Sequence, residues 1–235
     1  MNSKSFKIIL IILGIAVLIS LGVLYFSKSK PSDVPGTGPG TEEEEEFSYL
    51  IDFSNVGNIQ EAQLEILKQD YGLAVEEYEK NPNSFSALMT FAFTYYQLGD
   101  YEKARDVYIK IGEISSKNYT SFWNLANTYI RLKNYSGAER AYLRTIENGP
   151  DQTRHYTALA ELYWYNLPEK REQIPELYKK GLEELPGNYD LLVNLAWYYK
   201  ETGDKKNALK YYQEVIDNYP ETEEIIRAAM EEISD

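Results

Sequence analysis

The sequence predicts an all-α protein: a right-handed α-solenoid of repeated helix–turn–helix units, preceded by one transmembrane helix and a disordered linker. Three observations predict this class: a repeat of 34 to 36 residues, paired amphipathic segments around a short turn, and an uncharged apolar run near the amino terminus. The repeat is clearest at four alanines spaced by 34, 34 and 36 residues, namely Ala92, Ala126, Ala160 and Ala196. A period in this range means that one supersecondary unit is copied along the chain.

Each copy reads as two helices joined by a tight turn. In the first clear copy we expect one helix over 85–98, a turn over 99–101 and a second helix over 102–115. Apolar residues at i, i+3, i+4 and i+7 mark the buried face of the first helix: Leu88, Phe91, Ala92 and Tyr95. Prolines, which cannot extend a helix, end the second helix of three copies at Pro150, Pro186 and Pro220.

The amino-terminal segment predicts a membrane anchor. Residues 8–26 carry no charge, and a helix of this length spans the ~30 Å hydrocarbon layer at ~1.5 Å per residue. After a short tail over 1–7 we therefore expect a signal-anchor helix, with a cleaved signal peptide or a buried core helix as alternatives. A short tail ahead of a large domain favours a single-pass membrane protein whose repeat domain lies outside the cytoplasm.

Residues 27–46 read as a flexible linker. Proline, glycine, serine and a run of five glutamates cannot bury a core. The segment is expected to be a tether that lifts the repeats off the lipid, or a solvated spacer without a partner of its own.

Composition argues against several functions. The net charge of −13 disfavours nucleic acid as a partner. The chain has no cysteine, so disulfides, thiolate zinc sites and iron–sulfur clusters are excluded. His155 is the only histidine, which excludes catalytic triads and histidine metal clusters, and we expect it to be a partly exposed surface residue. We therefore expect no enzyme, no cofactor and no metal.

Three segments resemble tetratricopeptide repeats: YYQLGDYEKARDVY, TYIRLKNYSGAERAYLRTIENGP and WYYKETGDKKNALKYYQEVIDNYP. The resemblance divides the chain into four repeats over 85–118, 119–152, 153–188 and 189–222. The third departs from the pattern, because NLPEKREQIPELY replaces the usual turn, adds two residues and has no small residue where the others carry Ala104 and Ala138. Its two prolines, Pro168 and Pro175, predict a longer and stiffer loop between the helices.

Terminal repeats of such arrays need caps with a polar outer face. We expect residues 47–84 to form a degenerate copy, with a capping helix pair over 59–81. At the other end, residues 223–235 are expected to form a capping helix that covers the last repeat with Ile225, Ala228, Ala229 and Ile233.

The resemblance implies that the first helices of the repeats line a concave groove and that positions 2, 5, 9, 12 and 13 face it. Large rings with scattered polar groups suit a peptide-binding surface. The alternative is that the rings merely pack between adjacent helices. The predicted groove residues, which include all three tryptophans, are Phe93, Tyr96, Trp123, Asn127, Arg131, Arg154, Glu161, Trp164, Tyr165, Trp197 and Lys200.

Together these features predict a membrane-tethered scaffold that binds a peptide or segment of another protein in the groove. The alternative is a self-assembling structural component of an envelope complex, in which copies of the chain form a homo-oligomer. The carboxylate-clamp subtype of the family is not supported, because Asn124 and Arg154 match two clamp positions but Met89, Phe93 and Ala158 occupy the others. A peptide bound through apolar anchors is the expected ligand.

Overall fold

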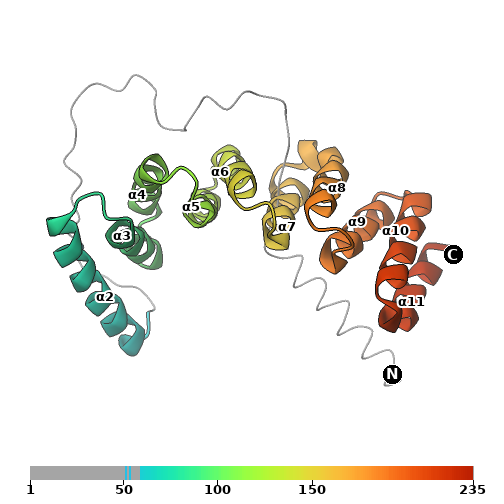
Figure 1. The fold of residues 1–235 in the computed structure, drawn as a ribbon, viewed down its shortest axis with the longest axis horizontal. Coiled ribbons are helices and arrows are strands. Elements are labelled where there is room, and N and C mark those ends of the chain that lie inside the picture. Colours follow the sequence, from blue (N-terminus) through green and yellow to red (C-terminus); the bar gives the residue numbers. More distant parts are fainter. Residues whose placement is uncertain (1–50, 52, 54–58, 235) are drawn as a thin grey trace. The chain divides into compact units, whose positions relative to one another are not determined.

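The computed structural model describes residues 51, 53 and 59–234 (Figure 1). In this part of the chain every regular element is a helix, so the all-α prediction is confirmed there. The predicted tail, anchor and linker over 1–46 lie outside the described residues. None of the described helices combines the length and apolarity needed to cross a membrane.

The first helices of the four repeats begin at residues 85, 119, 153 and 189, where the sequence places the starts of the repeats. The elements follow one another as α2 (Glu61–Lys80), α3 (Phe85–Gln97), α4 (Tyr101–Ile114), α5 (Tyr119–Arg131), α6 (Tyr135–Asn148), α7 (Thr153–Glu161), η1 (Leu162–Asn166), η2 (Pro168–Gln173), α8 (Ile174–Glu184), α9 (Tyr189–Glu201), α10 (Lys205–Asn218), η3 (Pro220–Thr222) and α11 (Glu223–Ser234). These helices fall into two compact units, one ending at Arg144 and one beginning at Thr145, and each is described by itself.

Three of the four turns within repeats close in the same way. A residue with positive φ ends the first helix in each: Gly99 at 82°, Lys133 at 56° and Gly203 at 79°. The next residue caps the second helix, as Asp204 does by accepting a hydrogen bond from the backbone N–H of Asn207 at 3.1 Å. The backbone N–H of the capping residue also donates a hydrogen bond to the carbonyl oxygen five residues earlier, as from Asp204 to Tyr199 at 2.8 Å. This closure folds the two helices of a repeat against each other.

The prediction of a helix pair over 59–81 is wrong, because α2 is one continuous helix of 20 residues. Gln69 occupies the turn position at which Gly99, Lys133 and Gly203 have positive φ. Glutamine is a good helix former, so the helix continues through this position. The buried face of α2 packs on α3 through Tyr71 and Tyr78, whose rings lie 5.5 and 5.4 Å from the ring of Phe91. On another face, seven residues apart, Ile66 and Leu73 are 61% and 60% exposed.

The carboxy-terminal helix caps its unit in a different register from the predicted one. Ile226 and Ile233 are buried on α11, whereas Ile225 is 38% exposed and Ala228 and Ala229 are half-buried. The helix follows the 3-10 turn η3 and begins at Glu223, and its first buried residue is Ile226 in place of the predicted Ile225. Ile226 and Ile233 stand seven residues apart on one face.

The prediction that His155 is partly exposed is also wrong. The side chain is 0% exposed, and its Nδ1 lies 2.7 Å from the carbonyl oxygen of Gly149. The tight connection from α6 to α7 brings this carbonyl over the imidazole, which position in the repeat alone does not reveal. Burial lowers the pKa of His155 to about 4.

Candidate functional site

In the compact unit that ends at Arg144, the predicted groove residues form two small clusters. In the first, the ring of Tyr96 packs edge-on against that of Tyr101 at 5.2 Å. The guanidinium of Arg131 lies 4.8 Å from the centre of the Tyr101 ring and donates a hydrogen bond to its hydroxyl. Phe93 belongs to neither cluster and is 48% exposed. Tyr101 therefore already engages the guanidinium of Arg131, and the exposed ring of Phe93 lies outside this contact.

In the second cluster, the ring of Trp123 packs edge-on against that of Tyr142 at 5.5 Å. The hydroxyl of Tyr142 donates a hydrogen bond to Oδ1 of Asn127 at 2.9 Å. Both contacts join α5 to α6 within one repeat. Trp123 and Asn127 thus make the kind of packing contact that is the alternative to an open groove.

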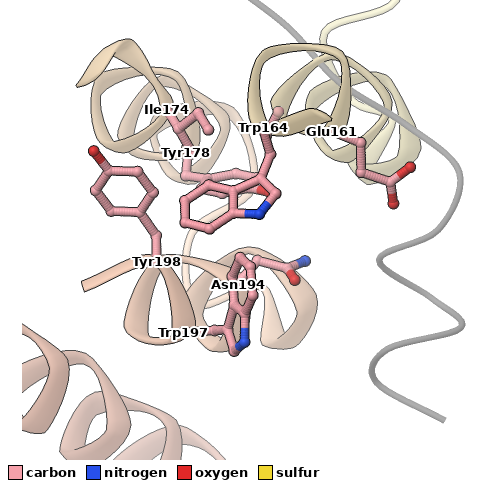
Figure 2. Close-up of a pocket in the computed structure, with 8 residues that line it drawn as sticks. Glu161, Trp164, Ile174, Tyr178, Asn194, Trp197 and Tyr198 are labelled. Carbon is pink, nitrogen blue, oxygen red and sulfur yellow. The ribbon is translucent and has the colours of Figure 1, made fainter. Parts of the chain in front are cut away.

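In the compact unit that begins at Thr145, three predicted residues come together around one hollow (Figure 2). Glu161, Trp164 and Trp197 line it, although Glu161 itself is almost fully buried. The hollow is shallow and open to solvent, with a volume of about 10 Å³. Its other lining residues are Ala160, Ile174, Tyr178, Asn194 and Tyr198.

The two indoles make the wall of the hollow. The ring of Trp164 lies 4.9 Å from that of Trp197 at an angle of 60°, and 6.0 Å from that of Tyr198 at 76°. Both tryptophans are half-buried. Tilted and edge-on contacts of this kind stabilise aromatic pairs beyond the area they bury, so the rings hold each other in place.

Of the remaining lining residues, Ala160 comes from α7 and the others come from α8 and α9. Ile174 and Tyr178 are buried, and burial, with a smaller contribution from Glu161, raises the pKa of Tyr178 far above its usual value. Asn194 rises from α9 beside Trp197 (Figure 2). Its side-chain amide makes no hydrogen bond to any residue that the structure describes, so its donors and acceptor are available to a ligand.

The sequence does not predict a role for Arg171, although its side chain contacts Trp164 directly. Its Nε donates a hydrogen bond to the carbonyl oxygen of Trp164 at 2.8 Å. Its guanidinium carbon lies 4.9 Å from the centre of the Trp164 ring. The residue lies in η2, within the segment that makes the third repeat longer than the others, where the family pattern has no position for it.

Three other predicted groove residues of this unit lie outside the hollow. Arg154 is exposed at the start of α7, and Tyr165 is 60% exposed on η1. Lys200 forms an ion pair with Glu232 of α11, with Nζ 2.6 Å from Oε2. The sequence also missed Asn194. This residue directly follows Val193, which occupies position 5 of the fourth repeat and is buried.

The chemistry of the hollow is that of contact rather than of reaction. Its lining offers two indole faces, two phenols, a primary amide and the almost fully buried carboxyl group of Glu161. Within the described residues, no group of three or more histidine or acidic side chains is placed to hold a metal ion. A volume of about 10 Å³ is far below the ~300–1,000 Å³ of typical small-molecule sites, so the two indoles offer a shallow contact surface for a bound segment rather than an enclosed pocket.

Three protein-family models match the chain, and all three describe the tetratricopeptide repeat. Models of the tetratricopeptide repeat match residues 87–109, 124–189 and 190–222, which together make up more than half of the chain. The first and last matches each fall within one predicted repeat. The middle match covers most of the second repeat and all of the third, including its insertion.

Three curated proteins are similar in sequence. An uncharacterized protein, ycf37, from Cyanophora paradoxa is 29% identical over 142 residues, which cover 56% of this chain and 81% of that protein. Tetratricopeptide repeat protein 8 of Mus musculus is 26% identical over 61% of this chain, and BBSome complex member BBS4 of Bos taurus is 26% identical over 63%. The matched region spans only 27% and 28% of these two mammalian proteins.

Solved structures share the fold. A crystal structure of MamA superposes with a TM-score of 0.53 at 16% identity, covering 71% of this chain and 98% of that one. YrrB, described as a tetratricopeptide-repeat protein with an unusual peptide-binding site, superposes with a TM-score of 0.50 at 17% identity, covering 72% and 86%. Identities this low show a common fold alone.

Proposed function

This chain belongs to the tetratricopeptide-repeat family, and from that premise we propose that it is a membrane-tethered scaffold that binds a segment of another protein. Residues 8–26 are the proposed anchor, and residues 27–46 separate it from the repeats. The proposed contact site for the partner is the hollow between Trp164 and Trp197. That YrrB has a peptide-binding site on a similar fold supports this assignment without fixing its position here.

The observation that carries the proposal is the pair of half-buried indoles in contact beside an amide without a partner. Apolar surface left open to water is costly, at about 25 cal/mol per Å². Covering both indoles with a partner side chain recovers part of that energy. Tryptophans in a preformed hollow are typical of the few residues that dominate a protein interface. Asn194 adds a directional contact for a peptide backbone.

Substitution of both tryptophans tests the site. We expect Trp164→Ala and Trp197→Ala to reduce capture of the partner from source-cell membranes, measured by pull-down with the full chain in detergent. The matched control is Ile225→Ala, which removes an exposed apolar side chain from α11, away from the hollow lining. Circular-dichroism melts establish that each variant folds. Unchanged capture by folded tryptophan variants would contradict the proposal.

The tether has its own test. We expect the full chain to sediment with membranes and a chain without residues 8–26 to stay in the supernatant. Protease added outside intact cells is expected to digest the repeats. Digestion only after the cells are opened would place them on the cytoplasmic side instead.

Self-assembly is the second candidate, and the exposed Ile66 and Leu73 on α2 favour it. Seven-residue spacing places both on one face, as in helices that pair. However, α2 carries six acidic residues against two lysines, so a second copy would be repelled. Light scattering of the full chain in detergent decides between the candidates. A mass that rises with concentration and falls to the monomer in Ile66→Ser/Leu73→Ser would favour self-assembly.

A further inference from the structure

The turn of the third repeat lacks the closure found in the other three. No residue between Leu162 and Ile174 has a positive φ. The chain instead makes a π-helical turn, in which the N–H of Leu167 donates to the carbonyl oxygen of Leu162 at 2.8 Å, followed by the 3-10 helix η2. The segment that carries Trp164 is therefore wider than an α-helix. Turns of this kind occur frequently at functional sites.

Arg171 supplies the cap that this turn lacks. Its Nε donates to the carbonyl oxygen of Trp164, and its guanidinium stacks on the indole of the same residue. One side chain thus fixes both the backbone and the ring of Trp164. A guanidinium held at two points loses less conformational freedom when it binds a further group.

The fixed guanidinium still has donors to spare. Arginine has five N–H groups, and only the one on Nε is engaged by Trp164. Neither Nη atom has a hydrogen-bond or ion-pair partner in the described part of the chain, and the residue is exposed. Burial raises the pKa of Tyr198, and the charge of Arg171 offsets part of this rise, so that charge acts at the rim of the hollow.

We propose that Arg171 and the Trp164–Trp197 hollow form one site, which binds an apolar side chain together with a neighbouring carboxylate. The indoles take the apolar side chain, and the two Nη groups take the carboxylate in the paired geometry that guanidinium favours. This inference rests on the proposed function and names the chemistry of the bound segment. It uses none of the clamp positions that Met89, Phe93 and Ala158 fill with other residues.

Two acidic residues bear on this site. Glu172 acts on Tyr198 in the opposite sense to Arg171, raising its pKa. Glu161 lines the hollow but is almost fully buried. Net charge therefore does not select an acidic ligand here, and the selection comes from the fixed direction of the Arg171 donors.

Two matched pairs of small peptides test the inference on the full chain in detergent. The first pair is acetyl-Gly-Leu with a free terminal carboxylate and the same peptide with a terminal amide. The second is acetyl-Leu-Asp-amide and acetyl-Leu-Asn-amide, which moves the carboxylate onto a side chain. Binding is followed by the indole N–H resonances of the three tryptophans, assigned with Trp→Phe variants. We expect the carboxylate member of at least one pair to bind about tenfold more tightly, as a charge-assisted hydrogen bond implies.

Variants of two neighbouring cations separate positioning from charge. Arg171→Gln removes the donors, and Arg171→Lys keeps the charge without the planar fork. Both are expected to lose most of the preference for the carboxylate. Lys170→Gln makes the same change in charge one residue away, where the ammonium lies 5.7 Å from the ring of Tyr163, and should keep the preference. Because the readout is a ratio between matched peptides, a general loss of stability does not imitate it.

The outcomes are distinct. Equal binding of all four peptides at Trp164 and Trp197 would overturn this inference and leave the proposed function standing. A preference that survives in Arg171→Gln, or no binding by any peptide, would also overturn it. The proposed function fails separately, if the tryptophan variants still capture the partner. The pair that shows the preference identifies a chain terminus or an acidic side chain as the source of the carboxylate.

Discussion

At the scale of the residue, burial decides the state of His155. The imidazole is fully buried, and its Nδ1 donates a hydrogen bond to the carbonyl oxygen of Gly149. Because burial disfavours the charged imidazolium, the folded protein favours the neutral imidazole. Its pKa is about 4 in the folded protein and near 6.5 in the unfolded chain. Between these values the unfolded chain binds the extra proton, so stability falls as pH falls.

The first prediction follows from this shift. The contribution of His155 to the free energy of unfolding is fully present above pH 6.5 and is lost as pH falls toward 4, by about 3 kcal/mol in total at ~1.4 kcal/mol per pH unit. Urea unfolding of wild type and His155→Asn at several pH values measures it. The carboxylates titrate in both proteins, so their effect cancels in the difference between the two free energies of unfolding. That difference is therefore expected to change over this pH window through His155 alone. A constant difference would show that His155 titrates normally.

The three tryptophans show what a residue's position in a repeat predicts about its surroundings and what it does not predict. The period places Trp123, Trp164 and Trp197 on equivalent faces, and the structure shows all three half-buried. Trp164 and Trp197 share a hollow, while Trp123 packs on Tyr142. The periodic pattern predicts the face on which a residue lies. It does not predict which neighbouring ring reaches that face, because this depends on the path of the chain between helices.

At the scale of the element, α8 approaches its neighbours through a glycine. A Cβ built on Gly181 would lie 2.9 Å from Cδ1 of Leu191 on α9 and 3.1 Å from the ring of Tyr156 on α7. Both neighbours are fully buried. The packing of α8 therefore depends on the missing side chain.

The second prediction compares two helical glycines. Gly181→Ala is expected to lower the free energy of unfolding, because overpacking costs about 1–3 kcal/mol and exceeds the ~1 kcal/mol gained in helix propensity. Gly72→Ala in α2 is expected to raise it by up to about 1 kcal/mol, since a Cβ there meets nothing within 4 Å. Chemical denaturation measures both. A stabilised Gly181→Ala would mean that Leu191 or Tyr156 moves aside at little cost.

The elements also show where the sequence stopped being informative. Period and proline spacing were sufficient for the starts of the four repeats. The continuous α2 depends on one glutamine at a turn position, and α11 buries Ile226 where the sequence offers the neighbouring Ile225 as well. The hydrophobic pattern does not distinguish the alternatives in either helix. Arg171 was missed because it lies in an insertion, where no periodic position exists.

At the scale of the whole molecule, charge is the dominant global property. The chain has 37 acidic and 24 basic residues, and six of the eight charged residues on α2 are acidic. Excess charge of one sign destabilises a compact state through self-repulsion. Salt screens this repulsion over about 10 Å at 0.1 M.

The third prediction concerns this repulsion. The melting temperature of the full chain in detergent is expected to rise as sodium chloride increases from low concentration to about 0.1 M, where screening takes effect. Potassium chloride should give the same rise, since the effect depends on ionic strength alone. Circular dichroism at several salt concentrations measures it. A falling melting temperature would show that attractive ion pairs such as Lys200–Glu232 outweigh the repulsion.

The longer spacing between Ala160 and Ala196 has a consequence for relatives of this chain. The third repeat has two additional residues, and these set the width of the turn from which Trp164 reaches Trp197. Homologues that keep the 34-residue step throughout are then expected to lack the site even where both indoles are retained. Length variation in that one segment would be the means by which such proteins gain or lose a ligand.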